Sequence, residues 1–223
     1  MLVAGDASIE ATGFMSGGAS VVRIGGVGPD IYQTTLVVPE QLSSLTIYHA
    51  LPLLVPDETV ITVEGRDLEA KQLRDGIMTG GPNLSGRAAV SFRIHDSFLV
   101  ADAIHAVYDP DMNEQDANHD NAPIPTSLLM GQPPRVDGDP ERWLAISEGE
   151  TARLAGHASS YSYDSFTPQL NLFIPDVLGT ALAYHILPVV FDSHDSAWGL
   201  IESSQERATG VEITLSGGVF RAR

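Results

Sequence analysis

Apolar and polar positions follow the same pattern in two stretches of the chain. Residues 36–55 read LVVPEQLSSLTIYHALPLLV, residues 172–191 read LFIPDVLGTALAYHILPVVF, and the two stretches align without a gap. Seven positions are identical, and in the first stretch they are Leu36, Pro39, Leu42, Tyr48, His49, Leu51 and Pro52. A recurrence of this kind predicts two related structural units, and we call the two stretches the first and second repeat.

Each repeat is expected to form a strand, then a short helix or turn, then another strand. An apolar run precedes a proline and an acidic residue, at residues 39–40 and 175–176. A proline followed by a carboxylate suits the first turn of a helix. In the second repeat Leu178, Leu182 and Ile186 share one helical stripe, which predicts a helix. The first repeat is richer in serine and threonine and is expected to form a turn or an extended segment instead.

A Tyr-His pair recurs in the two repeats, as Tyr48-His49 and Tyr184-His185. Paired histidines at equivalent positions could serve as ligands. The interpretation that we favour is structural, because buried tyrosines and histidines commonly satisfy one hydrogen bond inside a core.

The other regular segments are mostly strands. Residues 87–95 alternate apolar and polar side chains, residues 59–64 are rich in β-branched residues, and residues 98–108 favour a strand. Residues 211–221 predict a hairpin that turns at Ser-Gly-Gly. A short helix capped by Asp67 is expected over residues 67–74.

The sequence therefore predicts a mainly β protein. We expect jelly-roll or β-sandwich-like barrels, in two related units with a short helix each. The predicted organisation is a first β unit at residues 1–108, an irregular acidic and proline-rich connection at residues 109–142, and a second β unit at residues 143–223. A connection of that length is usually functional or makes contacts.

The charge composition indicates the ionic strength in which the protein works. The chain has 29 acidic and 12 basic residues, a formal net charge of −17, and Lys71 is its only lysine. Such an excess repels itself at low ionic strength but is screened in molar salt, where the Debye length is about 3 Å. We expect a halophilic source, with an acidic protein of a GC-rich mesophile as the alternative. Direct nucleic-acid binding is disfavoured, since it needs clustered Lys and Arg.

The cysteine content, the first residues and the longest apolar stretch bear on where the protein is found. There is no cysteine, which excludes disulfides and thiolate chemistry. The first residues lack the basic and apolar regions of a signal peptide. The longest apolar stretch, residues 177–191, is too short to span a bilayer.

One acidic loop partly resembles a calcium-binding loop. Asp109, Asp111 and Asn113 offer oxygen ligands at positions 1, 3 and 5, and Asp120 stands at position 12. Glu114 replaces the glycine of the EF-hand pattern, and no helices are expected beside it. Calcium or magnesium binding there is one hypothesis, and a solvated acidic loop is the other. Asn83 begins a glycosylation sequon, a short pattern that arises often by chance.

No catalytic motif is evident. His95-Asp96-Ser97 and His194-Asp195-Ser196 contain the residue types of a hydrolase triad. Neighbouring residues of a strand point to opposite faces, so adjacency does not build a proton relay. No G-x-S-x-G elbow occurs that would present a serine. We therefore expect a protein that is not an enzyme.

The size, acidic composition and β-rich organisation resemble the small β-barrel (vertical single jelly-roll) major capsid proteins of haloarchaeal icosahedral viruses with an internal membrane. The resemblance covers the whole chain but includes no diagnostic motif, so it transfers no functional residue. It implies a shell subunit located in the virion, whose partners are copies of itself, other capsid proteins and the internal viral membrane. The alternatives are a cytoplasmic halophilic enzyme or binding module with a divalent metal in the loop 109–120, and a tail or decoration protein of a haloarchaeal tailed virus.

Overall fold

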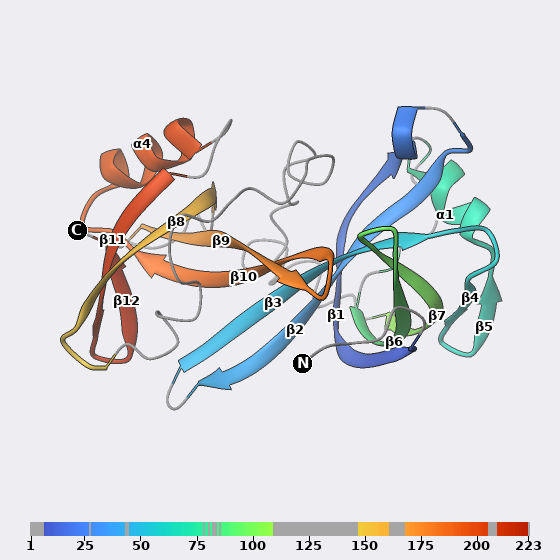
Figure 1. The fold of residues 1–223 in the computed structure, drawn as a ribbon, viewed down its shortest axis with the longest axis horizontal. Coiled ribbons are helices and arrows are strands. Elements are labelled where there is room, and N and C mark those ends of the chain that lie inside the picture. Colours follow the sequence, from blue (N-terminus) through green and yellow to red (C-terminus); the bar gives the residue numbers. More distant parts are fainter. Residues whose placement is uncertain are drawn as a thin grey trace. The chain divides into compact units, whose positions relative to one another are not determined.

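The structure is a computed structural model, and it describes residues 7–26, 28–42, 45–77, 79, 81, 84, 86–108, 147–160, 168–204 and 209–222. The described elements are β1 (Ile9–Val22), η1 (Ile24–Gly26), β2 (Ile31–Leu42), β3 (Leu45–Val55), β4 (Val60–Val63), β5 (Arg66–Leu68), α1 (Ala70–Gly76), β6 (Gly86–His95), β7 (Phe98–Tyr108), β8 (Thr151–Ser160), β9 (Gln169–Leu178), β10 (Ala181–Val190), α4 (His194–Ser204), β11 (Thr209–Ser216) and β12 (Val219–Ala222). The mainly β class is confirmed (Figure 1).

The first half of the chain forms a five-stranded mixed barrel. Its strands follow the order β3-β2-β1-β6-β7. The pairs β1–β2, β1–β6 and β6–β7 are antiparallel. The ring closes through a parallel pair, in which Leu53 and Leu54 of β3 lie opposite Leu99 and Val100 of β7. Beyond this pair β4 continues beside β7, also in parallel, and β5 forms the edge.

The second half repeats the same order. Its strands run β10-β9-β8-β11-β12, and the closing pair is again parallel. Val189 and Val190 of β10 lie opposite Phe220 and Arg221 of β12. Val189 stands at the position of the second repeat that Leu53 holds in the first. The two barrels therefore agree in strand order, in the direction of the closing pair, and in the repeat position that makes it.

Contacts divide the molecule into two compact units that exchange hairpin tips. Unit 1 contains most of the first barrel and also Val177–Ala183, the tip of the β9–β10 hairpin. Unit 2 contains most of the second barrel and also Pro39–His49, from the β2–β3 hairpin. Ala181 and Ala183 are buried in the core of unit 1, and Ile47 is buried in the core of unit 2. Each core is thus completed by side chains from the other half of the sequence.

The helix predicted in the second repeat is wrong. Both repeats form β-hairpins, and the second turns at Gly179-Thr180, where Gly179 has a φ of +64°. Pro175 lies inside β9 rather than at the start of a helix. Apolar residues are so dense here that they satisfy the periods of a helix and of a strand alike, so the stripe could not decide between them.

The jelly-roll form is also not what the described strands show. A jelly roll has eight antiparallel strands, whereas each barrel here has five and closes through a parallel pair. A short helix does occur in each half, but outside the repeats. α1 begins at Ala70, three residues after the expected cap at Asp67, because the Glu69 N–H donates to Gln72 Oε1 at 2.9 Å.

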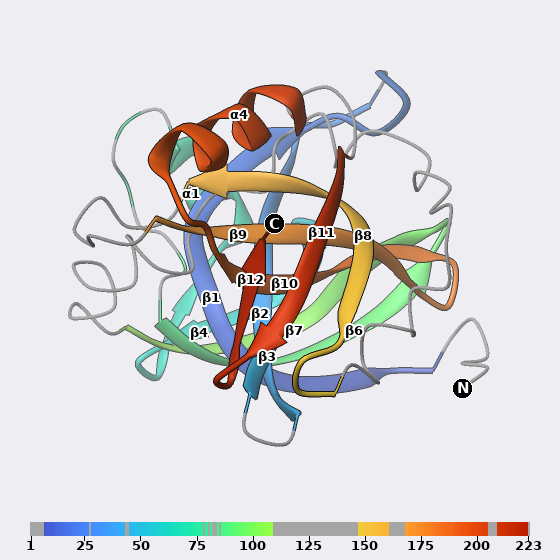
Figure 2. The same cartoon turned by 90° about the vertical axis from the view of Figure 1, so that its left-hand side faces the viewer.

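The second helix is fixed to its barrel at its C-terminal end. The Ala158 N–H donates to Ser204 Oγ at 2.9 Å, and His157 Nδ1 lies 2.7 Å from Ser204 O. Both contacts join α4 to β8, beside which it lies in unit 2 (Figure 2). At the other end, Ser193 Oγ accepts the Ser196 N–H at 3.1 Å and caps the helix.

Candidate functional site

The residues predicted to bind a divalent cation, Asp109, Asp111, Asn113 and Asp120, lie outside the described residues, as does the sequon residue Asn83. The metal site and the glycosylation site therefore stay predictions. Among the residues that the structure does describe, no group of three or more histidine, aspartate or glutamate side chains is arranged to hold a metal ion.

The two His-Asp-Ser sets occupy a turn and a helix start. Asp96 and Ser97 connect β6 to β7 with φ angles of 48° and 67°, as in a two-residue hairpin loop. His95 Nε2 lies 3.4 Å from Asp96 Oδ2, and both side chains are exposed. In the second set, Ser196 is engaged in the cap of α4. Neither set brings a serine, a histidine and a carboxylate into a relay.

The histidines of the two repeats, by contrast, come together in unit 2. The rings of His49 (β3) and His185 (β10) contact each other edge to face, with centroids 4.7 Å apart and planes at 62°. Asp176, on β9, lies with its Oδ2 2.5 Å from His185 Nε2. The His185 side chain is only 8% exposed, and that of Asp176 is 31% exposed.

This histidine cluster (His49, His185 and Asp176) combines two imidazoles and one carboxylate. The carboxylate fixes the orientation of the His185 ring, and that ring presents a surface to His49. All three members occupy repeat positions. His49 and His185 are equivalent residues of the two repeats, and Asp176 is the residue of the second repeat that corresponds to Glu40 in the first. The sequence showed the recurring Tyr-His pair, but not that its histidines would meet.

The tyrosine that precedes His185 is part of the core. Tyr184 is fully buried and packs edge to face on Phe173, with ring centroids 6.4 Å apart. Burial raises the pKa of the Tyr184 phenol well above its usual value. The phenol therefore stays neutral at physiological pH, which supports the structural interpretation of this half of the Tyr-His pair.

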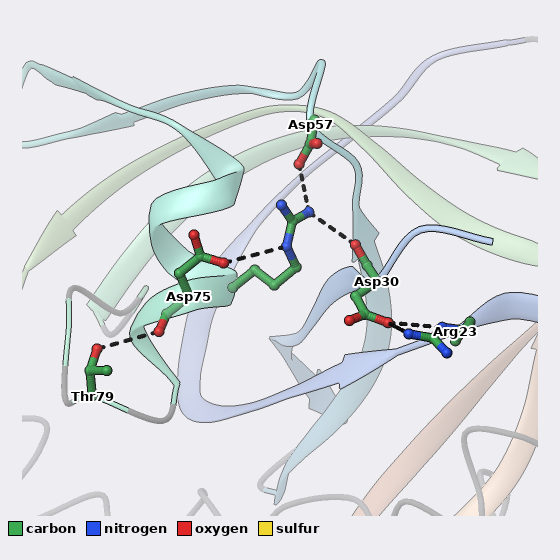
Figure 3. A network of polar contacts seen from close by, with 6 residues as sticks. Arg23, Asp30, Asp57, Asp75 and Thr79 are labelled. Atoms are coloured by element: carbon green, nitrogen blue, oxygen red, sulfur yellow. Dashed lines mark hydrogen bonds and ion pairs between the residues drawn. The ribbon is translucent and has the colours of Figure 1, made fainter.

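A second polar cluster, in unit 1, includes Asp30, Asp57 and Asp75, which Figure 3 labels, and Arg74 of α1 contacts all three. Arg74 Nη1 donates to Asp57 Oδ1 at 2.8 Å and to the Asp30 carbonyl oxygen at 2.9 Å, and Nε lies 3.8 Å from Asp75 Oδ1. Asp30 also pairs with Arg23, at 2.6 Å. The Arg74 side chain is 17% exposed. Its guanidinium therefore acts as an internal clamp that joins α1, the start of β2 and the turn before β4.

Unit 2 also contains an open hollow of about 310 Å³ between α4, β11 and β12. Its apolar lining includes Phe191, Leu200 and Val211, and the carboxylates of Asp192 and Glu212 stand among its polar residues. Among the described residues that line it there is no lysine or arginine. The hollow therefore combines an apolar lining with two acidic side chains.

Comparisons with known proteins do not assign a family. No family model matches the chain, and no curated protein matches it. A solved structure described as "Structural mimicry for functional antagonism" is similar with a TM-score of 0.22 and 7% sequence identity, over 97% of this chain and 91% of its own. A likeness this weak carries no argument about fold or function. In the described part of the chain, no helix has the length and apolar character needed to cross a bilayer.

Proposed function

We propose that this chain is a non-enzymatic structural protein of a halophilic archaeal virion, and in the first place a major capsid subunit of its icosahedral shell. The observation that carries the proposal is the repeated barrel, with the same five-strand order twice and hairpin tips exchanged between the units. Because the chain contains the same barrel twice, each molecule has two related outer surfaces. That suits an assembly in which every subunit meets several copies of itself.

The exchange of hairpins supports the same proposal. Side chains from each half of the chain are buried in the core of the other unit, so loss of either core would expose residues of both halves. A shell subunit has to resist dissociation, and such shared burial favours this resistance. The proposal depends on this arrangement and on the charge of −17, not on a jelly-roll fold.

The proposed partners follow from the same function. They are other copies of this chain and other capsid proteins, with the internal viral membrane as a further contact, and the proposed location is the virion. Direct contact with nucleic acid is not part of the proposal, because an excess of carboxylates repels phosphate.

Quantitative mass spectrometry of purified virus particles tests this proposal. A capsid subunit should be among the most abundant proteins of the particle, whereas a tail or decoration protein should occur in far fewer copies. The matched control is the soluble fraction of the same infected cells. Presence in that fraction together with absence from particles would reject a virion role.

A second candidate function is a binding module. The five-strand order, with a helix before the last two strands of each barrel, resembles the OB-fold, a Greek-key barrel that binds oligonucleotides or oligosaccharides. The charge of the chain favours an uncharged oligosaccharide over a nucleic acid. Binding to a glycan array in molar salt, by a chain that does not enter particles, would favour this candidate.

A further inference from the structure

We propose that the outer face of β1, β6, β7 and β4 in unit 1 binds the same face of a second molecule of this chain, in a two-fold symmetric contact. The inference names a surface through which the proposed shell subunit would assemble, and to that extent it rests on the proposed function. Self-association of the purified chain is nevertheless measured independently of virus particles.

Strand register places the side chains of this face in three rows. Thr12, Ala89, His105 and Thr62 lie side by side on the four strands and form the central row. On one side of it lie Arg87 and Val107, and on the other lie Glu10, Ser91, Ala103 and Val60. These side chains point away from the barrel, since they alternate along each strand with buried residues such as Ala88, Val90 and Ile104.

The face combines small residues with exposed apolar ones. Val60 is 58% exposed and Val107 is 60% exposed, the two largest values for valine in the described residues. Between them lie alanine, serine and threonine, with His105 as the one larger side chain of the central row. Covering the two valines would remove apolar surface from water in both molecules at once, and that favours association.

Charge distinguishes this face from the chain as a whole. Glu10 and Arg87 carry opposite charges, and the Arg93 guanidinium forms an ion pair with Asp102 on the same two strands, β6 and β7. The formal charges of β1, β6, β7 and β4 on this face therefore cancel, although the chain carries −17. By contrast, α4 carries Asp195 and Glu202 with no lysine or arginine. Two molecules can approach through the neutral face without confining like charges between them.

The positions of the two charges select a second molecule of the same chain as the partner. Consider two of these faces packed against each other, with the two-fold axis perpendicular to the strands and along the central row. The row that contains Arg87 then lies over the row of the second molecule that contains Glu10, and the row that contains Glu10 lies over the row that contains Arg87. Arg87 then faces Ser91 and its neighbour Glu10 on the second molecule, and Val107 faces Ala103. Each of these contacts occurs twice, as a self-complementary interface requires. The strands of the two molecules stay nearly aligned, the usual arrangement of packed sheets.

Within one molecule the same two charges are separated. Arg87 lies opposite Phe14 and Glu10 lies opposite Ser91, four residues further along the strand pair. At about 3.3 Å per residue this separation exceeds the reach of an ion pair. Their complementarity is therefore available to a partner.

Sedimentation velocity in molar KCl tests the inference, over a range of concentrations. We expect the native chain to shift from monomer to dimer as concentration rises. Glu10→Arg and Arg87→Glu should each weaken dimerisation by about tenfold (~1.4 kcal/mol) at the lowest KCl concentration at which the chain stays folded. The loss should be smaller in molar KCl, where the charges are screened. The double variant with both reversals should recover most of the native affinity, because the exchanged charges face each other again.

Val107→Glu provides an independent variant, and Val219→Glu is its matched control. Val219 is an exposed valine on β12 of unit 2, so its substitution should leave dimerisation unchanged. Circular dichroism and thermal unfolding verify that each variant is folded. A native chain that stays monomeric at every concentration would overturn the inference, as would a failure of the double reversal to restore affinity or an equal loss from Val219→Glu.

The two proposals fail in distinguishable ways. If the chain dimerises through this face but is absent from particles, the proposed interface is supported and the virion role is rejected. If the chain is abundant in particles but its dimerisation is insensitive to Glu10→Arg, Arg87→Glu and Val107→Glu, the virion role is supported and this interface is rejected.

Discussion

His49 and His185 hold the same position in the two repeats, and they contact each other edge to face with ring centroids 4.7 Å apart. The contact forms because the β2–β3 hairpin carries His49 into unit 2, where His185 is paired with Asp176. The sequence repeat thus supplies both rings of one cluster, at a place where a hairpin from the first half of the chain completes the second barrel.

Removing the carboxylate of this cluster should cost stability. In Asp176→Ala the His185 ring, nearly buried, loses its acceptor at 2.5 Å. We expect the free energy of unfolding to fall by about 1–3 kcal/mol, the usual cost of depriving a buried polar group of its partner. Denaturant unfolding in molar KCl measures this change.

Asp96→Asn is the matched control for that variant, because asparagine removes the charge but suits a turn residue with a φ of 48°. Asp96 also stands beside a histidine, His95, but both side chains are well exposed and the distance is 3.4 Å. Exposed pairs contribute little, so we expect a change within about 0.5 kcal/mol. Equal losses in the two variants would show that the burial of His185 does not matter.

The Arg74 clamp predicts a contrast between two arginines. Arg74→Ala removes a mostly buried side chain that donates to Asp57 and to the Asp30 carbonyl oxygen. The free energy of unfolding should fall by about 1–2 kcal/mol, since each hydrogen bond contributes about 0.5–1.5 kcal/mol and water can solvate the exposed acceptors. Arg23→Ala removes only an exposed pair with Asp30 and should cost at most about 1 kcal/mol. Hydrogen exchange should also rise in α1 of the first variant. Loss of the clamp without faster exchange in α1 would contradict the role given to Arg74.

Local patterns predicted the strands well. Val211 and Ile213 alternate with polar neighbours, and this alternation sufficed to predict β11 and the turn at Gly217. The strand β6 followed from the same signal, with alternate residues buried and outward-facing. Period-two patterning depends only on which side of a sheet faces the core, so it can be read directly from the sequence.

Tertiary arrangement was less accessible. An apolar side chain does not indicate which core will bury it, so nothing in the sequence indicated that Ile47 would be buried in unit 2 or Ala181 in unit 1. The Arg74 clamp joins residues as far apart as Arg74 and Asp30, a separation that no local pattern encodes. The predicted metal ligands at residues 109–120 stay predictions.

Two glycines at equivalent places in the barrels should be intolerant of substitution. A methyl group on Gly13 of β1 would collide with the Val37 carbonyl oxygen, and one on Gly156 of β8 would lie 2.7 Å from the Phe173 carbonyl oxygen. Val37 and Phe173 are equivalent repeat positions. We expect Gly13→Ala and Gly156→Ala each to lower the free energy of unfolding by about 1–3 kcal/mol, because backbone must move to admit the methyl group.

Gly199→Ala is the control for these glycines. It lies inside α4, where an added Cβ meets open space, and alanine favours a helix over glycine by about 1 kcal/mol. Thermal unfolding should therefore show the opposite sign for this variant. Destabilisation by Gly199→Ala, or tolerance of Gly13→Ala, would contradict the packing described.

Buried tyrosines should make the protein sensitive to alkali. Burial raises the pKa of Tyr32 from 10.0 to about 12, hydrogen bonds offset it only in part, and burial raises that of Tyr184 as well. Between pH 10 and 12 the unfolded chain has lost the Tyr32 proton while the folded chain keeps it. The folded state is then at a disadvantage, and stability falls by about 1.4 kcal/mol per pH unit for each such tyrosine. The contribution is fully present below pH 10.

Unfolding measured at intervals from pH 9 to pH 12, with absorbance at 295 nm reporting tyrosinate, examines this prediction. Lys71 is the only lysine, so tyrosines dominate the titration in this range. The phenylalanine of Tyr32→Phe cannot ionise, so the stability of this variant should fall less steeply than that of the native chain, and Tyr184 should contribute to the slope that remains. Identical slopes for the two proteins would mean that the Tyr32 phenol ionises in the folded state as readily as in the unfolded one.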